Sequence, residues 1–281
     1  MQAQLEQIRD QQKESWNKIS GGWKKWDGMV MDFLKPMGDE IIRLINPKGD
    51  DFVLDVASGT GEPGLTIATM LTGGRVVIND FAEDMVVIAR ENAIRKGIAN
   101  FETDTSDISE LPFADNTFDA ISCRFGFMFF PDMLLAVKEM VRVLKPGGRI
   151  ATSVWNIPEK NFWVTAIMGS INKNLQLPPA LPGAPGMFRC AQKGFMRDLF
   201  VQAGLRNLCE TEIDGKLDCG DAEGYWNFMS EVAGPVAAAL SKVDDEMKDK
   251  IKNDVFLSVK QKYPEDKTMV DSSAIVIYGE K

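Results

Sequence analysis

The stretch Phe52-Val-Leu-Asp-Val-Ala-Ser-Gly-Thr-Gly-Glu-Pro-Gly64 combines an apolar run, a glycine-rich turn and the start of a helix. The apolar run is short and rich in branched side chains, as expected for a strand buried in a parallel sheet. The glycines allow positive φ angles and close approach of a ligand to the backbone. Pro63 suits the first turn of a helix, where its missing N–H costs no hydrogen bond. The stretch therefore predicts an α/β fold with a ligand-binding turn after its first strand.

The identity of the ligand depends on the residues around this turn. The spacing Gly59-x-Gly61-x-x-Gly64 matches the fingerprint of dinucleotide-binding proteins. Asp55 argues against a dinucleotide such as NAD, because a carboxylate here would repel the pyrophosphate. S-adenosylmethionine (SAM) instead carries a sulfonium and an amino group, both cationic, which an acidic strand end would stabilise. We therefore predict SAM as the cofactor; the structural alternative is that a buried Asp55 only caps the turn or the following helix.

The same turn resembles a known motif. The pattern Asp55-x-Ala57-x-Gly59-x-Gly61 is similar to motif I of the class I SAM-dependent methyltransferases, with Ala57 where that family often has its first glycine. By this resemblance, Asp55 and the turn hold the methionine end of SAM. The residues assigned to it are Asp55, Ala57, Ser58, Gly59, Thr60 and Gly61.

Asp80 closes the second predicted strand, 19 residues after Gly61. At this spacing an acidic side chain can accept hydrogen bonds from both ribose hydroxyls, a device that NAD and SAM sites share. Its structural alternative is an N-cap for a helix over 82–97, and both roles are compatible. Phe81 and Met85 would then lie near the adenine or the methionine tail.

Two further segments strengthen the resemblance and narrow it. Asp107-Ile-Ser-Glu-Leu-Pro-Phe113, followed by a turn and Phe118-Asp-Ala-Ile121, resembles the adenine-binding segment and fourth strand of the ubiquinone/menaquinone-biosynthesis (UbiE/COQ5-like) methyltransferases. The segment 142–149 resembles the final motif of the same family. By this resemblance Asp107 accepts a hydrogen bond from the adenine amino group and the Ile108 N–H contacts the ring. A loop cap is the structural alternative for Asp107.

The residues that leave the fourth strand form an aromatic run. In the family that the sequence resembles, this region lies beside the transferring methyl group. The resemblance therefore places Arg124 and Phe125 at the cofactor, and Phe127 and Met128 at the acceptor. Trp155, at the end of the fifth strand, is also predicted to bind substrate. Burial in the core is the alternative for each aromatic residue.

The alternation of strand and helix patterns after residue 52 predicts a parallel sheet with right-handed crossovers. The segment Met269–Tyr278 is expected to add an antiparallel strand, typical of this fold. The complete expectation is a Rossmann-like, seven-stranded, mostly parallel sheet with helices on both faces. This SAM-binding domain spans 47–281 and includes helical lid insertions at about 156–190 and 215–262, where acceptor specificity would be set.

The N-terminal segment 1–46 is predicted to form a helical lid before this domain. A helix over residues 1–19 is expected to break at Gly21-Gly22, a second helix to end near Pro36, and a third to cover about 37–45.

The aromatic residues of this segment allow two interpretations. The first is burial in the core, which is the usual fate of aromatic side chains at this density. The second is a lid in which Trp23 or Trp26 stacks near the sulfonium, an interaction that would be worth about 1 kcal/mol.

Composition excludes several functions. The chain of 281 residues has no histidine, which rules out Ser-His-Asp and Cys-His catalysis and histidine-bound metals; no metal is predicted. A net charge of −9 disfavours nucleic acid as a partner. Four scattered cysteines and the lack of a secretory signal indicate a cytoplasmic protein with reduced thiols. No apolar run is long enough for a membrane span.

We therefore predict an enzyme, a SAM-dependent methyltransferase acting on a small, apolar or aromatic acceptor by in-line S_N2 displacement, with S-adenosylhomocysteine (SAH) as product. Family resemblance favours a quinol-like carbon or a natural-product hydroxyl. The first alternative is a non-catalytic SAM-binding protein of the same fold. The second is an NAD-dependent oxidoreductase using Tyr263-x-x-x-Lys267, a spacing that Pro264 places in a loop rather than on a helix. The acceptor atom, any general base and the oligomeric state stay open; a homodimer is compatible.

Overall fold

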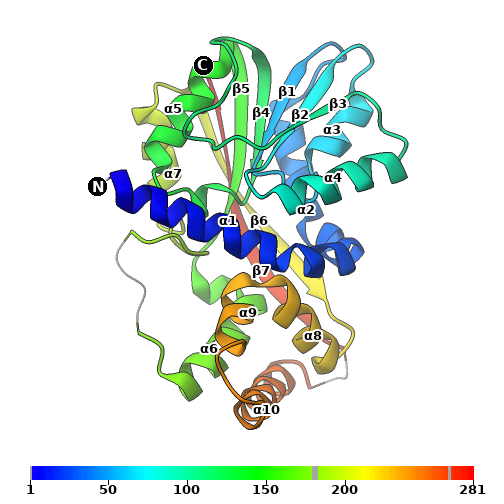
Figure 1. The fold of residues 1–281 in the computed structure, drawn as a ribbon, viewed down its shortest axis with the longest axis vertical. Helices are drawn as coiled ribbons and strands as arrows, with labels where there is room; N and C mark the ends of the chain where they lie inside the picture. Colours follow the sequence, from blue (N-terminus) through cyan, green and yellow to red (C-terminus); the bar gives the residue numbers. More distant parts are fainter. Residues whose placement is uncertain (1, 179–182, 265–266) are drawn as a thin grey trace.

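The computed structural model describes residues 2–178, 183–264 and 267–281, which form a sheet module and a cap of helices beyond one edge of the sheet (Figure 1). The strands of the sheet are β1 Phe52–Val56, β2 Arg75–Asn79, β3 Phe101–Asp104, β4 Phe118–Arg124, β5 Leu144–Trp155, β6 Arg206–Asp218 and β7 Met269–Glu280. The α-helices are α1 Gln2–Lys25, α2 Asp27–Ile45, α3 Gly64–Met70, α4 Glu83–Arg95, α5 Met133–Val143, α6 Phe162–Leu175, α7 Phe195–Gln202, α8 Ala222–Val232, α9 Gly234–Leu240 and α10 Asp245–Lys262.

The sheet has the strand order β3-β2-β1-β4-β5-β7-β6. Strands β1 to β5 pair in parallel, while β7 is antiparallel to both β5 and β6. This confirms the predicted seven-stranded, mostly parallel sheet and its antiparallel last strand. Because β1 lies between β2 and β4, the turn that follows it opens at the centre of the carboxyl edge, where open α/β sheets bind ligands.

Helices cover both faces of the sheet, and the side chains of β1 show how. Leu54 and Val56 pack in the cluster that includes α5 and α7, whereas Val53 packs with the side chains of α3 and α4. Successive strand residues point to opposite faces, so Asp55 faces the same side as Val53. The only acidic residue of β1 is therefore directed at the start of α3.

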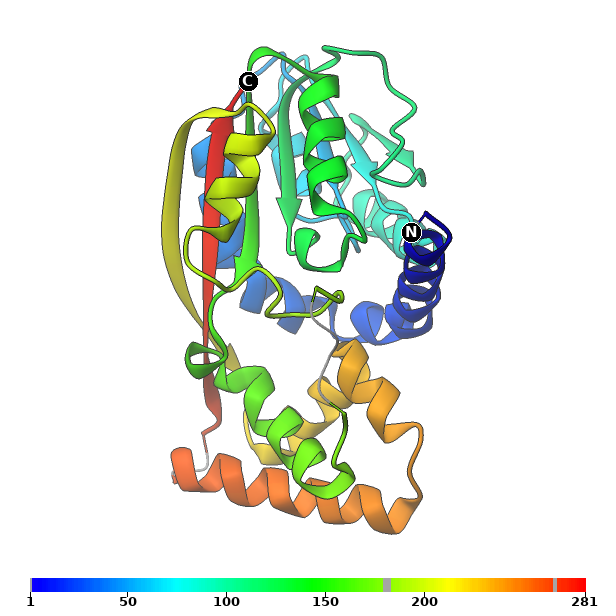
Figure 2. The same cartoon turned by 90° about the vertical axis from the view of Figure 1, so that its left-hand side faces the viewer.

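The helices α6, α8, α9 and α10 pack together as a helical cap beyond the carboxyl edge of the sheet. Strands β6 and β7 extend past the edge to reach this cap (Figure 2). The predicted second insertion was expected to begin at 215, but β6 continues to Asp218 by pairing with Met269 of β7. Residues 179–182 of the predicted first insertion lie outside the described residues, as do residues 265–266 of the predicted loop after α10.

The end of α10 tests the alternative hypothesis of an oxidoreductase with Tyr263 and Lys267 on one helix. Because α10 ends at Lys262, Tyr263 and Lys267 do not share a helix.

No helix in the described part of the chain has the length and apolar character required to cross a membrane.

The prediction that Gly21-Gly22 ends the first helix was wrong. Helix α1 runs through both glycines to Lys25. A Cβ atom at Gly22 would lie 2.1 Å from the carbonyl oxygen of Glu231 in α8, whereas one at Gly21 would meet nothing within 4 Å. Gly22 is therefore required for close packing of two helices, not for a turn.

The predicted helix end at Pro36 was also wrong, because α2 continues through it to Ile45. An internal proline costs about 3 kcal/mol. On either side of Pro36, the buried residues Phe33, Leu34, Met37 and Ile41 pack against the core. Burial of this apolar face offsets the local cost.

Strand β5 contains an irregularity near its start, where its pairing with β4 shifts register. Leu144 pairs with Phe118 and Arg149 with Ala120, so the intervening residues form an irregularity in a continuous strand. Gly147 adopts a φ of 76° and donates its N–H to the carbonyl oxygen of Lys281. This bond to the end of the chain keeps the segment attached to the sheet.

The two adjacent glycines of α1 provide a matched test of helix packing. We expect Gly22→Ala to lower the free energy of unfolding by about 1–3 kcal/mol, because the methyl group collides with the α8 backbone. Gly21→Ala should be neutral or stabilising by up to about 1 kcal/mol, because alanine favours helix and open space surrounds it. Denaturant unfolding of both variants measures the difference. Equal effects would contradict the close approach of α1 and α8.

Candidate active site

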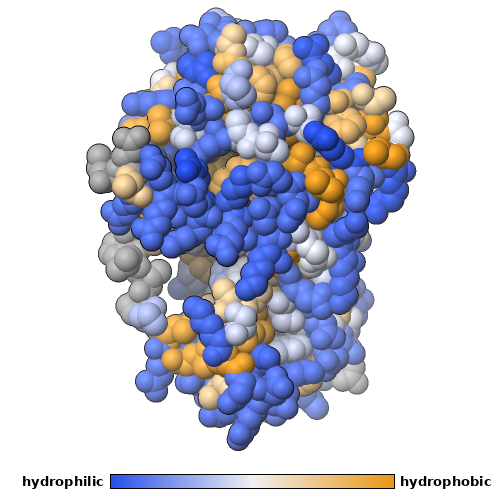
Figure 3. All heavy atoms as spheres, viewed as in Figure 1, coloured by the Kyte–Doolittle hydropathy of each residue, from blue (hydrophilic) through white to orange (hydrophobic). Residues whose placement is uncertain are grey.

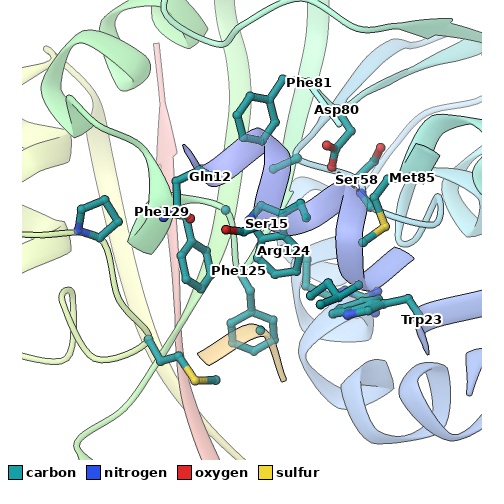
Figure 4. A pocket seen from close by; sticks show the side chains of 18 of the residues that line it. Gln12, Ser15, Trp23, Ser58, Asp80, Phe81, Met85, Arg124, Phe125 and Phe129 are labelled. Atoms are coloured by element: carbon teal, nitrogen blue, oxygen red, sulfur yellow. Dashed lines mark hydrogen bonds between the residues drawn. The ribbon is translucent and has the colours of Figure 1, made fainter. Parts of the chain in front are cut away.

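A cavity of about 360 Å³ lies at the carboxyl edge of the sheet, between the sheet module, α1, α2 and the helical cap. Asp80, Ser58 and Met85 group on one side of it, and Phe129 lies on the opposite side (Figure 4). Helix α1 crosses the front of the molecule at this level, where the surface is mostly hydrophilic (Figure 3). The cavity is thus covered from the front by a helix whose outer face is polar.

Asp55 does not line this cavity. Its side chain is fully buried, and its carboxylate accepts hydrogen bonds from the Gly64 N–H at 2.9 Å and the Ser122 hydroxyl at 2.6 Å. Burial raises the pKa of Asp55 to about 7, despite these two bonds. Asp55 therefore has the structural role that was its alternative, because it holds the turn and the start of α3 against the sheet.

Asp80 lies at the end of β2 and lines the cavity. Its carboxylate oxygens accept from the Gly59 N–H at 2.8 Å and the Ala82 N–H at 2.9 Å. Burial raises the pKa of Asp80 to about 6, against these two bonds. Asp80 therefore supports the turn after β1 and the entry to α4, while each oxygen keeps a lone pair for a ligand.

Asp107 and Ile108 follow β3 and both line the cavity. Asp107 accepts a hydrogen bond from the Ser109 N–H at 2.8 Å, so it caps its own loop. Its second oxygen lies 3.8 Å from the Arg9 Nε of α1. Asp107 thus lines the cavity, as a cofactor-binding residue would, and also caps its own loop, which was the structural alternative.

The structure brings most of the predicted site residues together. Those that line the cavity are Trp23, Ala57, Ser58, Gly59, Asp80, Phe81, Met85, Asp107, Ile108, Arg124, Phe125 and Trp155. Those that do not line it are Trp26, Asp55, Thr60, Gly61, Phe127 and Met128. Their assignment as binding residues stays a prediction that the cavity itself does not support.

The residues outside the cavity have identifiable alternative contacts. Trp26 donates its indole N–H to Glu231 at 2.9 Å and packs on Phe228. Phe127 and Met128 are fully buried in the core, because the chain forms a short 3-10 helix there and turns them inward. The same helix directs Phe129 into the cavity instead.

The turn itself shows why small residues are needed. Ala57 and Gly59 have positive φ angles of 50° and 55°. A Cβ at Gly59 would meet nothing within 4 Å, so open space lies directly above the backbone there. Gly61 has a φ of 108°, a conformation that side chains rarely adopt, and a Cβ there would also lie 2.7 Å from the side chain of Leu65 in α3.

Four aromatic residues form one wall of the cavity: Phe33, Phe125, Trp155 and Trp163, called here the aromatic wall. Phe125 stacks on Trp155 with ring centroids 4.0 Å apart, and Trp155 lies 4.7 Å from Trp163. Phe33 of α2 completes the group, 5.2 Å from Trp163. Phe125 holds this position with a φ of 64°, a strained conformation for a bulky residue.

Sequence reasoning missed several lining residues. Glu62 directly follows the glycine turn, so its place beside the motif was available as a signal. Gln12, Ser15, Trp16 and Ile19 of α1 also line the cavity, and their spacing on one helical face was the signal for them. Phe33, Trp163 and the helical-cap residues carried no local signal.

The described cavity holds few ionisable groups. They are Glu62, Asp80, Asp107 and Arg124, and Arg124 directly precedes Phe125 of the aromatic wall. Across residues 2–178, 183–264 and 267–281, acidic and cysteine side chains do not gather in a group that could hold a metal ion.

The chain matches the model of the ubiE/COQ5 methyltransferase family over residues 18–164. This match covers more than half of the chain, which therefore belongs to that family. Membership confirms the predicted resemblance to the UbiE/COQ5-like methyltransferases.

Individual relatives agree with this assignment. A demethylmenaquinone methyltransferase of Listeria monocytogenes serotype 4a is 37% identical over 123 residues, which cover 42% of this chain and 52% of the relative. A ubiquinone/menaquinone biosynthesis C-methyltransferase of Cellvibrio japonicus is 40% identical over 112 residues, covering 39% and 45%. The matches thus span about half the length of these relatives.

A solved structure shares the fold across nearly the whole chain. The YcgJ protein of Bacillus subtilis superposes with a TM-score of 0.57 at 21% sequence identity, covering 87% of this chain and 97% of that protein. At this identity the similarity establishes the architecture alone.

The role of Asp80 leads to a pH-dependent prediction. Because its pKa is raised to about 6, the carboxylate is charged at pH 7.5 and becomes protonated as the pH falls toward 5. We expect the affinity for SAH to fall over this range and Asp80→Asn to weaken binding at pH 7.5 by about 1–3 kcal/mol. Calorimetric titration at several pH values measures both effects.

The pH profile of the variant serves as the internal control. The affinity of Asp80→Asn for SAH should change less between pH 7.5 and 5 than that of the unmodified protein. Asp249→Asn, at an exposed position of α10, should leave affinity and profile unchanged. Unaltered affinity of Asp80→Asn would contradict a contact between Asp80 and the ligand.

Proposed function

We propose that this protein transfers the methyl group of SAM to a small aromatic acceptor of the quinol type. The observation that carries this proposal is the division of one cavity into two chemically different parts. One part contains the glycine turn and Asp80, and the other is the aromatic wall. In a protein of this family, these parts suit a nucleoside cofactor and a planar apolar acceptor respectively.

The cofactor part fits SAM by the chemistry of its groups. Asp80 offers carboxylate oxygens to ribose hydroxyls, and open space lies above Gly59 for a ligand against the backbone. Met85 and Ile108 offer apolar surface for the adenine, beside the carboxylate of Asp107. When bound, SAM supplies an electrophilic methyl group.

The acceptor part argues for an aromatic ring. Stacked or edge-on aromatic contacts add about 0.5–1.5 kcal/mol each beyond the area they bury. The relatives whose names specify quinone methylation make a quinol the leading acceptor class. In the proposed transfer, the acceptor forms a bond to the methyl carbon as the S–CH₃ bond breaks, the sulfonium becomes the thioether of SAH, and the acceptor proton leaves to water.

The protein contributes positioning rather than a base. We assign no base to the acceptor part, because the four residues of the aromatic wall are not ionisable, and in this proposal the acceptor reacts by itself or as its anion. Alignment of two bound reactants lowers a barrier by several kcal/mol without acid–base help. Coverage of the cavity by α1 and the helical cap also limits the access of bulk water to the reacting centre.

We also propose that α1 acts as a lid over the cofactor part. Trp16, Ile19 and Trp23 line the cavity from this helix. Lys13 pairs with Glu83 of α4 at 2.6 Å, and the indole N–H of Trp23 donates to the Val232 carbonyl of α8 at 3.1 Å. These contacts tie the lid to the sheet module and to the helical cap.

The lid proposal predicts faster release of product. Removing the residues before Ser15 deletes the Lys13–Glu83 pair and the cavity contact of Gln12, while Trp16 and the rest of α1 stay. We expect the dissociation rate of SAH to rise roughly three- to tenfold, in line with a loss of about 1 kcal/mol. Stopped-flow fluorescence measures it, and an unchanged rate would contradict the lid.

The function itself is tested by binding and then by transfer. Calorimetric titration with SAH and, separately, NADH should show binding of SAH alone; binding of NADH alone would restore the oxidoreductase reading. Incubation with methyl-labelled SAM and a set of quinols and phenols should then yield labelled product. SAH binding without transfer to any aromatic acceptor would favour the non-catalytic SAM-binding alternative.

The aromatic wall predicts a separation of acceptor and cofactor effects. Phe33→Leu keeps most of the buried volume but removes two aromatic contacts. We expect kcat/KM for the acceptor to fall about tenfold, with SAH affinity changed less than twofold. Phe52→Leu, which breaks an aromatic pair with Phe118 outside the cavity, is the matched control and should leave both unchanged. Equal loss of acceptor and SAH binding would overturn this division of the cavity.

A further inference from the structure

Arg124 is a cation that faces the cavity without an anionic partner. It ends β4, next to the turn after β1. Within the described residues, its guanidinium makes a single weak polar contact, with Nη2 lying 3.7 Å from the sulfur of Met31. No ion pair within 4.0 Å joins it to any described carboxylate. Most of its five N–H donors are therefore available to a ligand.

The surroundings of Arg124 make an unpaired charge costly. Burial lowers the pKa of Arg124, and the more distant charges of Glu62 and Asp55 only partly oppose this. A buried charge is retained in proteins when it is paired and hydrogen-bonded. A ligand in the cavity can therefore supply the partner that the described residues do not provide.

Glu62 presents the opposite charge in the same cavity. Its Oε2 accepts from the N–H and the hydroxyl of Thr66 at 3.0 and 2.7 Å, and its Oε1 pairs with Lys96. It is nevertheless among the residues that line the cavity. A positive and a negative group, not paired with each other, therefore face one cavity beside the glycine turn.

We propose that Arg124 binds the α-carboxylate of the methionine part of SAM, while Glu62 faces its α-ammonium. This inference rests on the proposed function. A carboxylate and an ammonium on one carbon match two opposite charges that line one cavity and do not pair with each other. A guanidinium also binds a carboxylate through two parallel hydrogen bonds, which fixes its direction. These two residues take the part that the sequence assigned to Asp55.

The packing around Arg124 supports a positioning role. A Cβ at Gly38 of α2 would lie 3.6 Å from Nη1 and 3.8 Å from Pro63. The guanidinium is therefore packed against the backbone of α2 beside the first residues of α3. A side chain held in place before binding loses little freedom when the ligand arrives.

Three ligands that differ only in the methionine part test this assignment. SAH carries both charged groups, S-adenosyl-3-thiopropylamine lacks the carboxylate, and 5′-methylthioadenosine lacks both. We expect Arg124→Gln to weaken binding of SAH roughly 10- to 150-fold, the range for a charged hydrogen-bonded pair. Its affinity for the other two ligands should change less than threefold. Arg124→Lys should recover part of the SAH affinity because it keeps the charge.

Calorimetric titration of all variants gives the result. Arg95→Gln, an exposed arginine of α4 outside the cavity, is the control for arginine loss and should bind all three ligands normally. Thermal unfolding without ligand checks that Arg124→Gln is folded; if it is not, the comparison of Arg124→Lys across the three ligands decides.

The possible outcomes separate this inference from the proposed function. Equal weakening of all three ligands would overturn the carboxylate contact and give Arg124 a structural role. Normal SAH binding combined with a raised KM for the acceptor would overturn it in favour of an anionic acceptor. If the unmodified protein binds SAH no more tightly than the thiopropylamine, the inference alone fails; if it binds none of the three, the proposed function fails with it.

Discussion

The carboxylate of Asp55 is the contact on which the centre of the structure depends. It joins β1 to the start of α3 through the Gly64 N–H and to β4 through the Ser122 hydroxyl. A Cβ at Gly64 would lie 2.7 Å from this carboxylate, so the contact requires glycine there. Because burial raises the pKa of Asp55 to about 7, the bond is made at a real cost in desolvation. It fixes the turn that forms the floor of the cavity.

A second carboxylate, Asp80, extends this arrangement from the turn to β2. Its bonds to Gly59 and Ala82 tie two neighbouring strand ends together at the carboxyl edge. The cavity therefore has a floor made by the sheet, whereas its roof comes from α1 and the helical cap. This division matches a common arrangement in which a fixed scaffold holds the cofactor and more variable segments determine what reacts with it.

The sheet and most of the cofactor part could be predicted because their signals are local. Alternation of strands and helices, the turn after β1 and the acidic residues after β2 and β3 each depend on neighbouring residues in the sequence. The errors arose where distant segments decide the outcome. Gly22 predicts the end of a helix from its sequence context, but in the structure it allows the backbone of Glu231 to approach closely. Pro36 also predicts a helix end, but burial of the neighbouring residues stabilises α2 through it.

The sequence by itself determined the fold class, the family and the place of the ligand-binding turn, because short motifs and hydrophobic periodicity specify the alternation of strands and helices and the local backbone shape. Only the tertiary structure decided which side chains face the cavity. Asp55 turns to α3 because side chains alternate along β1, while Arg124 faces the cavity beside Gly38 of α2, and Glu62 lines the same cavity. The aromatic wall joins Phe33 of α2, Phe125 after β4, Trp155 of β5 and Trp163 of α6, and such a contact has no signal within any one of these segments.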